Sequence, residues 1–199
     1  RHISDTPSTS PPADARPLLT LDFDGVICAP LFGRNGGISR EFLDPSAPPR
    51  RAFVPARWYA DPLDHLRFDL RRPLPEVREA LSRLSTLRRL TILTGRRSSP
   101  ESWLRRYGMA AFIDDIEFNA SEERSAHFKL RRSAELGAAE HIDDDPRTVQ
   151  LLAEAGALRV FLRDWPRNRG LPFVDGVTRV SELTALANLL EAEREGNLD

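Results

Sequence analysis

Residues 18–26, close to the start of the chain, read LLTLDFDGV. The opening LLTL is a short, mostly apolar run with the length and composition of a buried strand. Side chains alternate along a strand, so Asp22 and Asp24 point to the same side where this strand ends. Gly25 follows directly and allows the backbone to turn sharply. The stretch therefore predicts a buried strand that brings two carboxylates to one edge of a sheet.

Similar runs recur outward along the chain and alternate with helical periodicity. The strand-like runs are residues 18–23, 90–94, 116–119, 141–143 and 159–162. Apolar positions with helical spacing lie between and after them: Val77, Leu81, Leu84, Trp103, Leu104, Tyr107, Val149, Leu152, Leu183, Leu186 and Leu190. Residues typical of helix starts and ends flank these segments: Ser99-Pro100, Asp145-Pro146, Gly108 and Gly156. Strands that alternate with helices predict a doubly wound α/β domain with a mainly parallel sheet.

Two segments do not follow this alternation. Residues 1–16 contain several prolines and polar residues without apolar periodicity, which predicts a disordered tail ahead of a domain at 17–195. Residues 28–73 are rich in proline and aromatic residues and are long for a loop. We expect this second segment to be an insertion after the first strand that forms a lid or cap over the sheet edge.

The composition limits the classes of protein to consider. The chain has 199 residues, of which 40% are hydrophobic and 30% are charged, and its net charge is -1. This composition is typical of a soluble domain, and it argues against a membrane-spanning protein and against a general nucleic-acid binder. The single cysteine, Cys28, excludes an internal disulfide and a cysteine-based zinc site, so we expect a reducing, cytoplasmic setting. Among the 29 basic residues, Lys129 is the only lysine.

Polar side chains follow the strand-like runs at four places. They are Asp22 with Asp24, Thr94 with Gly95, Lys129 within the helical segment 121–136, and Asp143 with Asp144. In doubly wound sheets, ligands bind beyond the carboxyl ends of the strands, so these residues are the candidate site. Clustered carboxylates suit Mg²⁺. One carboxylate can attack phosphorus while a second transfers the proton. The set points to phosphoryl transfer, in which a cation, a hydroxyl and backbone N–H groups stabilise the phosphoryl oxygens.

In this order, the four places resemble the motifs of the haloacid dehalogenase-like superfamily. The resemblance covers most of residues 17–190 and implies a Rossmann-like sheet and a Mg²⁺-dependent phosphatase that acts through an aspartyl-phosphate. It assigns Asp22 as the nucleophile, Asp24 as the general acid and base, and Thr94, Gly95 and Lys129 as phosphate-binding groups. It also implies that four aspartates lie at the metal: Asp22, Asp24, Asp143 and Asp144.

A narrower resemblance concerns the C-terminal part of the domain. Residues 161–169, FLRDWPRNR, and 176–180, GVTRV, are similar to 5'(3')-deoxyribonucleotidase-like members of the superfamily. We therefore expect a small phosphorylated metabolite or a nucleotide as the substrate.

Two alternatives stay open. The arginine pairs of the insertion suggest a phosphatase that processes nucleic-acid ends, and the fold also suits a non-catalytic module that binds a phosphate or a partner. We interpret His141 as a residue that fills a strand position, and Cys28 as a small buried apolar residue. The sequence leaves the oligomeric state and the identity of the substrate undetermined.

Overall fold

A computed structural model describes residues 15–30, 71–171 and 175–196. The predicted tail up to residue 14 and the insertion between residues 31 and 70 lie outside the described residues. The two ends of the insertion are described. Cys28 forms an isolated bridge with Pro73, and the N–H of Ala29 donates to the Arg72 carbonyl at 2.9 Å. The two ends of the insertion therefore lie side by side.

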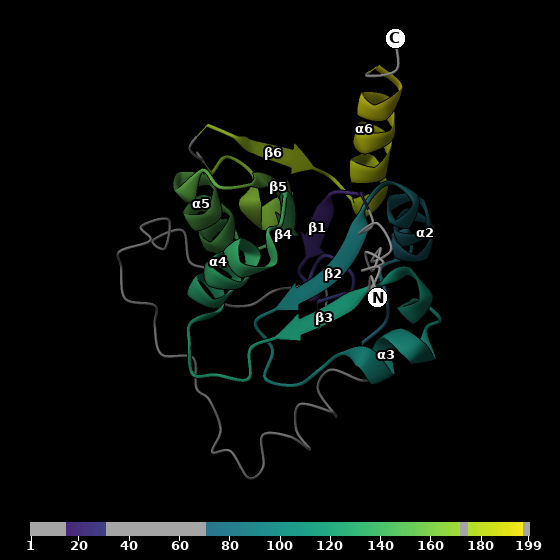
Figure 1. Cartoon of the computed structure of the whole chain (residues 1–199), viewed down its shortest axis with the longest axis horizontal. Helices are drawn as coiled ribbons and strands as arrows, with labels where there is room; N and C mark the ends of the chain where they lie inside the picture. Colours follow the sequence, from purple (N-terminus) through teal and green to yellow (C-terminus); the bar gives the residue numbers. More distant parts are fainter. Residues whose placement is uncertain (1–14, 31–70, 172–174, 197–199) are drawn as a thin grey trace, which may run out of the picture.

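A six-stranded parallel sheet forms the centre of the domain (Figure 1). Its strands, in sheet order, are β3 (Asp115–Phe118), β2 (Arg89–Thr94), β1 (Leu18–Leu21), β4 (Glu140–Asp143), β5 (Arg159–Arg163) and β6 (Val177–Val180). The chain builds outward from β1 to β3 on one side and then from β4 to β6 on the other. The order of the strands therefore reverses between β1 and β4, where ligands bind in doubly wound sheets. The predicted fold class is confirmed.

The strand β6 was not among the sequence predictions. It reads VTRV, and of its four residues only Val180 is buried. In the described sheet it pairs with β5 alone, at the edge. An edge strand with one buried position lacks the apolar run that identifies a central strand, so its pairing with β5 decides its conformation.

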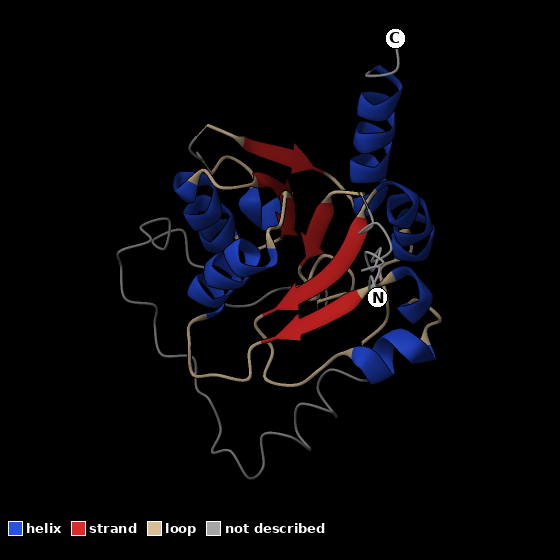
Figure 2. Cartoon of the chain, viewed as in Figure 1, coloured by secondary structure: helices blue, strands red, loops and turns tan. Residues whose placement is uncertain are grey.

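Helices cover both faces of the sheet (Figure 2). They are α2 (Val77–Leu87), α3 (Glu101–Arg106), α4 (Ser125–Leu136), α5 (Pro146–Ala155) and α6 (Leu183–Gly196), with short 3-10 turns at Ala110–Phe112 and Pro166–Asn168. Helices α2 and α6 pack together, and α4 packs with α5. Alternate side chains of β5 point to the helices on opposite faces of the sheet. Phe161 joins the core beneath α2 and α6, whereas Val160 and Leu162 pack against α5. Both layers therefore bury side chains of one strand.

The helix ends mostly follow the sequence signals. Asp145 caps α5 by accepting a hydrogen bond from the Arg147 N–H, and Gly156 ends this helix in the left-handed conformation. The sequence signal Ser99-Pro100 predicts a helix that begins at Pro100. Helix α3 begins one residue later, at Glu101, because Pro100 occupies the cap position. Helix α4 begins at Ser125 rather than at residue 121.

Asn119 explains the later start of α4. Its side-chain nitrogen donates to the Glu123 carbonyl at 2.7 Å, and its side-chain oxygen accepts from the Ser121 N–H at 3.1 Å. These contacts hold residues 121–123 in a turn, which competes with the first turn of a helix.

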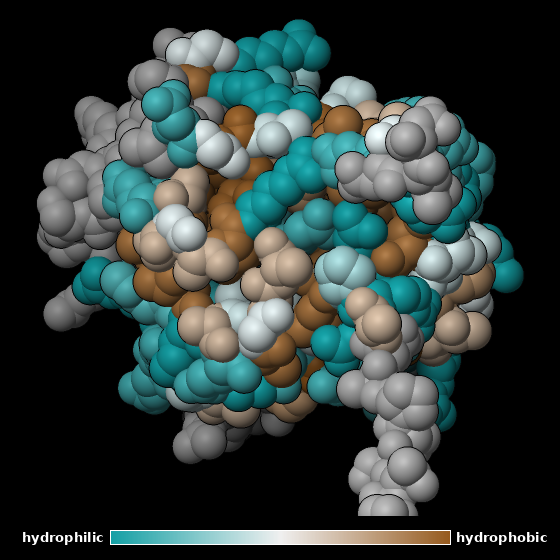
Figure 3. Space-filling model, turned by 45° about the horizontal axis from the view of Figure 1, so that its top comes forward, coloured by the Kyte–Doolittle hydropathy of each residue, from teal (hydrophilic) through white to brown (hydrophobic). Residues whose placement is uncertain are grey.

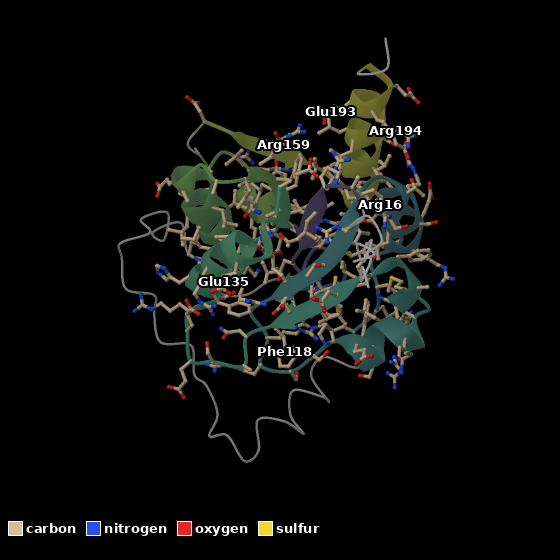
Figure 4. All side chains as sticks on the ribbon, in the orientation of Figure 1. Arg16, Phe118, Glu135, Arg159, Glu193 and Arg194 are labelled. Carbon is tan, nitrogen blue, oxygen red and sulfur yellow. The ribbon has the colours of Figure 1, made fainter. Side chains whose placement is uncertain are left out.

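The surface mixes hydrophilic and hydrophobic residues over the face seen in Figure 3. Ion pairs join distant elements, such as Arg159 at the start of β5 and Glu193 of α6, whose atoms approach to 2.7 Å (Figure 4). Arg16, at the end of the predicted tail, donates to the Ser85 carbonyl and so contacts the end of α2. Within the described residues, no helix combines the length and the apolar character needed to cross a membrane.

Candidate active site

The carboxyl ends of β1 and β4 bring the predicted aspartates together. The N–H of Asp22, directly after β1, donates to the Ile142 carbonyl of β4 at 2.9 Å. This bond continues the pairing of the two strands by one residue beyond β1. Asp22 therefore lies beside Asp143, although 120 residues separate them in the sequence.

Lys129 of α4 connects these two aspartates. Its Nζ atom lies 2.8 Å from Asp22 Oδ1 and 2.6 Å from Asp143 Oδ2, and all three side chains are buried. Burial favours the neutral amine, but the Asp143 and Asp22 carboxylates outweigh it and hold the pKa of Lys129 above its usual value. The lysine therefore stays charged, with its ammonium group fixed against the predicted nucleophile.

Asp143 is held on both of its oxygens. Oδ1 accepts from the Asp145 N–H at 2.9 Å, and Oδ2 lies 3.2 Å from His141 Nε2 in addition to its contact with Lys129. Burial favours the neutral acid, but Lys129 and His141 lower the pKa of Asp143 below its usual value. Asp143 is therefore an ionised carboxylate whose orientation is fixed.

His141 contributes to the site through Asp143. Burial lowers the pKa of His141, so its ring is neutral. Its Nε2 atom lies 3.2 Å from Asp143 Oδ2, and its Nδ1 atom lies 2.8 Å from the Thr20 hydroxyl oxygen. The sequence interpretation placed His141 correctly in a strand but missed this contact. The signal was its spacing of two from Asp143, which puts both side chains on one face of β4.

Three carboxylates form a group that suits a metal ion. Asp22, Asp143 and Asp144 are buried, and one oxygen of each lies within 4.8 Å of the others. Such oxygen ligands are the type that Mg²⁺ prefers. Burial raises the pKa of Asp22 well above its usual value, against the effect of Lys129, and it raises the pKa of Asp144 to about 7. A divalent cation at this group would stabilise the ionised form of both carboxylates against the effect of burial.

Gly25 makes room for Asp144. Its φ of 76° lies in the left-handed region, and an added Cβ would lie 1.8 Å from Asp144 Oδ2. The glycine of the opening stretch therefore does more than turn the chain, because it allows the Asp144 carboxylate to approach the loop after β1.

Asp24 lies outside this group of three. Its carboxylate accepts from Arg96 Nε at 2.8 Å, from Arg96 Nη2 at 2.9 Å and from Arg71 Nη1 at 2.5 Å. Its side chain is 27% exposed, against 8% for Asp22. The structure thus brings together three of the four predicted metal-binding aspartates and places the carboxylate of the fourth between two arginines.

The predicted phosphate-binding loop follows β2, the other neighbour of β1. Thr94 ends this strand and is buried, and its hydroxyl accepts from the Arg96 N–H at 3.3 Å. An added Cβ at Gly95 would lie 2.1 Å from the Ser125 hydroxyl oxygen at the start of α4. A larger residue at Gly95 would therefore push apart this loop and the helix that carries Lys129.

Several functional candidates were not predicted from the sequence. Arg71 and Arg96 contact Asp24, and Arg167 contacts Asp144 at 2.5 Å. Arginine is so frequent in this chain that no single one stands out. Cys28 agrees with its interpretation as an apolar residue, because burial and the nearby Asp24 raise the pKa of its thiol to about 12.

Comparisons with known proteins identify the fold. No protein-family model and no curated protein sequence matches the chain. Among solved structures, CbbY from Rhodobacter sphaeroides in complex with phosphate superposes with a TM-score of 0.57 at 15% identity, covering 86% of this chain and 96% of that one. A HAD-superfamily hydrolase of subfamily IA from Geobacter sulfurreducens gives a TM-score of 0.56 at 20% identity, covering 88% and 97%.

The neighbours also include a 2-haloacid dehalogenase from Pseudomonas syringae, with a TM-score of 0.51 at 16% identity and coverage of 89% and 99%. Proteins with different reactions therefore share this arrangement, so the reaction has to be argued from the side chains. The chain has the fold of the haloacid dehalogenase-like hydrolases.

Proposed function

We propose that this protein is a Mg²⁺-dependent phosphomonoester hydrolase that acts through an aspartyl-phosphate on Asp22. One observation carries the proposal: Lys129 is buried between Asp22 and Asp143, beside the further carboxylate of Asp144. A fixed cation at the nucleophile stabilises the charge on the phosphoryl oxygens during transfer. The phosphate-bound neighbour CbbY supports a phosphorylated ligand for this fold.

In the first step, a carboxylate oxygen of Asp22 attacks the phosphorus atom. The bond from phosphorus to the ester oxygen breaks, and Asp24 donates a proton to this leaving oxygen. In the second step, Asp24 takes a proton from water, whose oxygen attacks the phosphorus and releases inorganic phosphate and Asp22. Asp24 is the more exposed of the two side chains, and its contacts with Arg96 and Arg71 have to open for it to carry the proton.

The other residues of the site would bind the phosphate group or the metal ion. The Thr94 hydroxyl, the Gly95 backbone and Lys129 are our candidates for binding the phosphate group. Asp22 and Asp144 would hold Mg²⁺, which neutralises charge on the phosphoryl oxygens when it is bound. Asp143 belongs to the same group, but both of its oxygens already accept hydrogen bonds, so its main contribution is to orient Lys129.

The mechanism predicts that Asp22→Asn abolishes hydrolysis. An amide does not form the acyl-phosphate, so the rate on p-nitrophenyl phosphate with Mg²⁺ should fall by about 10³-fold or more. The matched control is Asp175→Asn, which makes the same change at an exposed aspartate. Circular dichroism and thermal unfolding of each variant check that the fold is retained.

Two results would contradict the proposal. One is near-normal hydrolysis by Asp22→Asn in the presence of Mg²⁺. The other is a wild-type protein that binds phosphate to saturation but yields no product from any phosphomonoester, which is the behaviour of a binding module.

A substrate screen distinguishes the classes of phosphomonoester. We propose a small phosphorylated metabolite or a nucleotide, so mononucleotides and sugar phosphates should give the highest kcat/KM. The comparison substrates are 3'-phosphorylated oligonucleotides. A preference for these, with binding that weakens steeply as salt increases, would instead identify a phosphatase for nucleic-acid ends.

A further inference from the structure

The last residue of β5 and the segment after it, residues 163–168, contact both loops that carry the aspartates. Arg163 Nη1 donates to the Val26 carbonyl at 3.0 Å, and Trp165 Nε1 donates to the Gly25 carbonyl at 2.9 Å. On the other loop, Asn168 Nδ2 donates to the Asp144 carbonyl at 3.0 Å. The segment therefore fixes the loop after β1 relative to the loop after β4, although it supplies no group to the proposed reaction.

Within this segment, Arg167 contacts a candidate metal ligand directly. Its Nη2 atom lies 2.5 Å from Asp144 Oδ2 and 3.2 Å from the Asp144 carbonyl oxygen. One nitrogen thus holds the carboxylate and the backbone of the same residue. This pair of contacts restricts rotation of the Asp144 side chain, which Gly25 already limits from the opposite loop.

We propose that Arg167 is a positioning residue that sets the affinity of the protein for Mg²⁺. This inference rests on the proposed function, because it assumes that Asp144 binds the metal ion. Arg167 holds Asp144 Oδ2 and so fixes the orientation in which the carboxylate would meet the ion. Loss of a partner that orients a metal ligand typically weakens metal binding about 10- to 100-fold.

Simple charge repulsion predicts the opposite sign. A guanidinium group close to the ion repels it, so removal of the positive charge would tighten metal binding. Two features of the structure favour the positioning effect. Arg167 is hydrogen-bonded to the carboxylate itself, which compensates its charge, and Asp144 is buried. Without Arg167, a buried carboxylate loses a close cation and a fixed orientation.

The test measures metal binding directly and without substrate. Mn²⁺, a spectroscopic substitute for Mg²⁺, is titrated into the wild-type protein, Arg167→Met and Arg167→Gln, and the free ion is followed by electron paramagnetic resonance. We expect the dissociation constant to rise about 10- to 100-fold in both Arg167 variants. Arg169→Gln, which removes the same charge from an exposed side chain two residues away, should bind like the wild type.

A second readout separates positioning from a general loss of structure. At saturating Mg²⁺, kcat of Arg167→Gln should return to near the wild-type value, while the Mg²⁺ concentration for half-maximal activity stays raised. If Arg167→Met does not fold, Arg167→Gln keeps the hydrogen-bonding character of the side chain and decides the question.

Equal or tighter Mn²⁺ binding by a folded Arg167 variant would overturn this inference and leave the proposed function intact. A wild-type protein that binds no divalent cation would overturn both. The two failures are therefore distinguishable in one titration series.

Discussion

At the scale of single residues, Lys129 is the most constrained side chain of the site. It is the only lysine of the chain, and its ammonium group fits between two carboxylate oxygens at 2.6 and 2.8 Å. A lysine offers a compact charge, whereas an arginine presents a wide planar fork. In this buried space, the fork would displace Asp22 or Asp143.

We therefore expect Lys129→Arg to lower kcat on p-nitrophenyl phosphate by about 10²-fold, the order of loss when one stabilising donor is misplaced. The control is Arg131→Lys, an exchange of the same two residue types at a more exposed position of α4. Steady-state kinetics at saturating Mg²⁺ provide the comparison. Full activity of Lys129→Arg would mean that the single lysine is a coincidence of composition.

At the scale of elements, the capping of α5 supports the loop that carries Asp143 and Asp144. Asp145 accepts from the Arg147 N–H and from the Thr148 hydroxyl, the latter at 3.0 Å. Its own N–H donates to Asp143. The side chain thus stabilises the helix, while the backbone of the same residue contacts the site.

Asp145→Ala removes the side-chain cap and leaves the backbone contact. We expect the free energy of unfolding to fall by about 0.5–2 kcal/mol, the usual loss for such a cap. Urea unfolding measures this change, with Asp175→Ala as the control at an exposed position. An unchanged free energy of unfolding would show that the Asp145 side chain contributes nothing to the stability of α5.

Local sequence patterns predict some helices and strands of this fold and miss others. Central strands such as β1 and β2 are recognisable because they are buried on both faces and read as apolar runs. The edge strand β6 and the turn before α4 depend on a neighbouring strand and on the Asn119 side chain, so their own residues give a weak signal.

At the scale of the whole molecule, metal binding and folding are linked through the aspartates. Burial raises the pKa of Asp144 to about 7 and also raises that of Asp22. At pH 5.5 the Asp144 carboxyl is mostly protonated, so a metal ion has to displace the proton. At pH 8 the group is ionised and the ion binds without this cost.

Mg²⁺ should therefore raise the melting temperature more at pH 8 than at pH 5.5, because a ligand that binds only the folded state stabilises it by RT ln(1 + L/Kd), where L is the free ligand concentration, and this stabilisation grows as the dissociation constant falls. Thermal unfolding with and without Mg²⁺ at both pH values tests this. In Asp144→Asn, which loses a titrating carboxylate, the difference between the two pH values should shrink. An equal Mg²⁺ effect at both pH values in the wild type would contradict the assignment of Asp144 to the metal.

The sequence by itself determined the class of fold and the four places where chemistry was expected. Both depend on local features: apolar runs that alternate with helices, and polar residues directly after the runs. Only the tertiary structure decided which of these residues contact one another. It placed Lys129 between Asp22 and Asp143, Asp24 between two arginines, and Arg167 against Asp144. The physical reason is that each of these contacts joins residues far apart in the chain. In a chain so rich in arginine, packing alone selects the few that meet a carboxylate of the site.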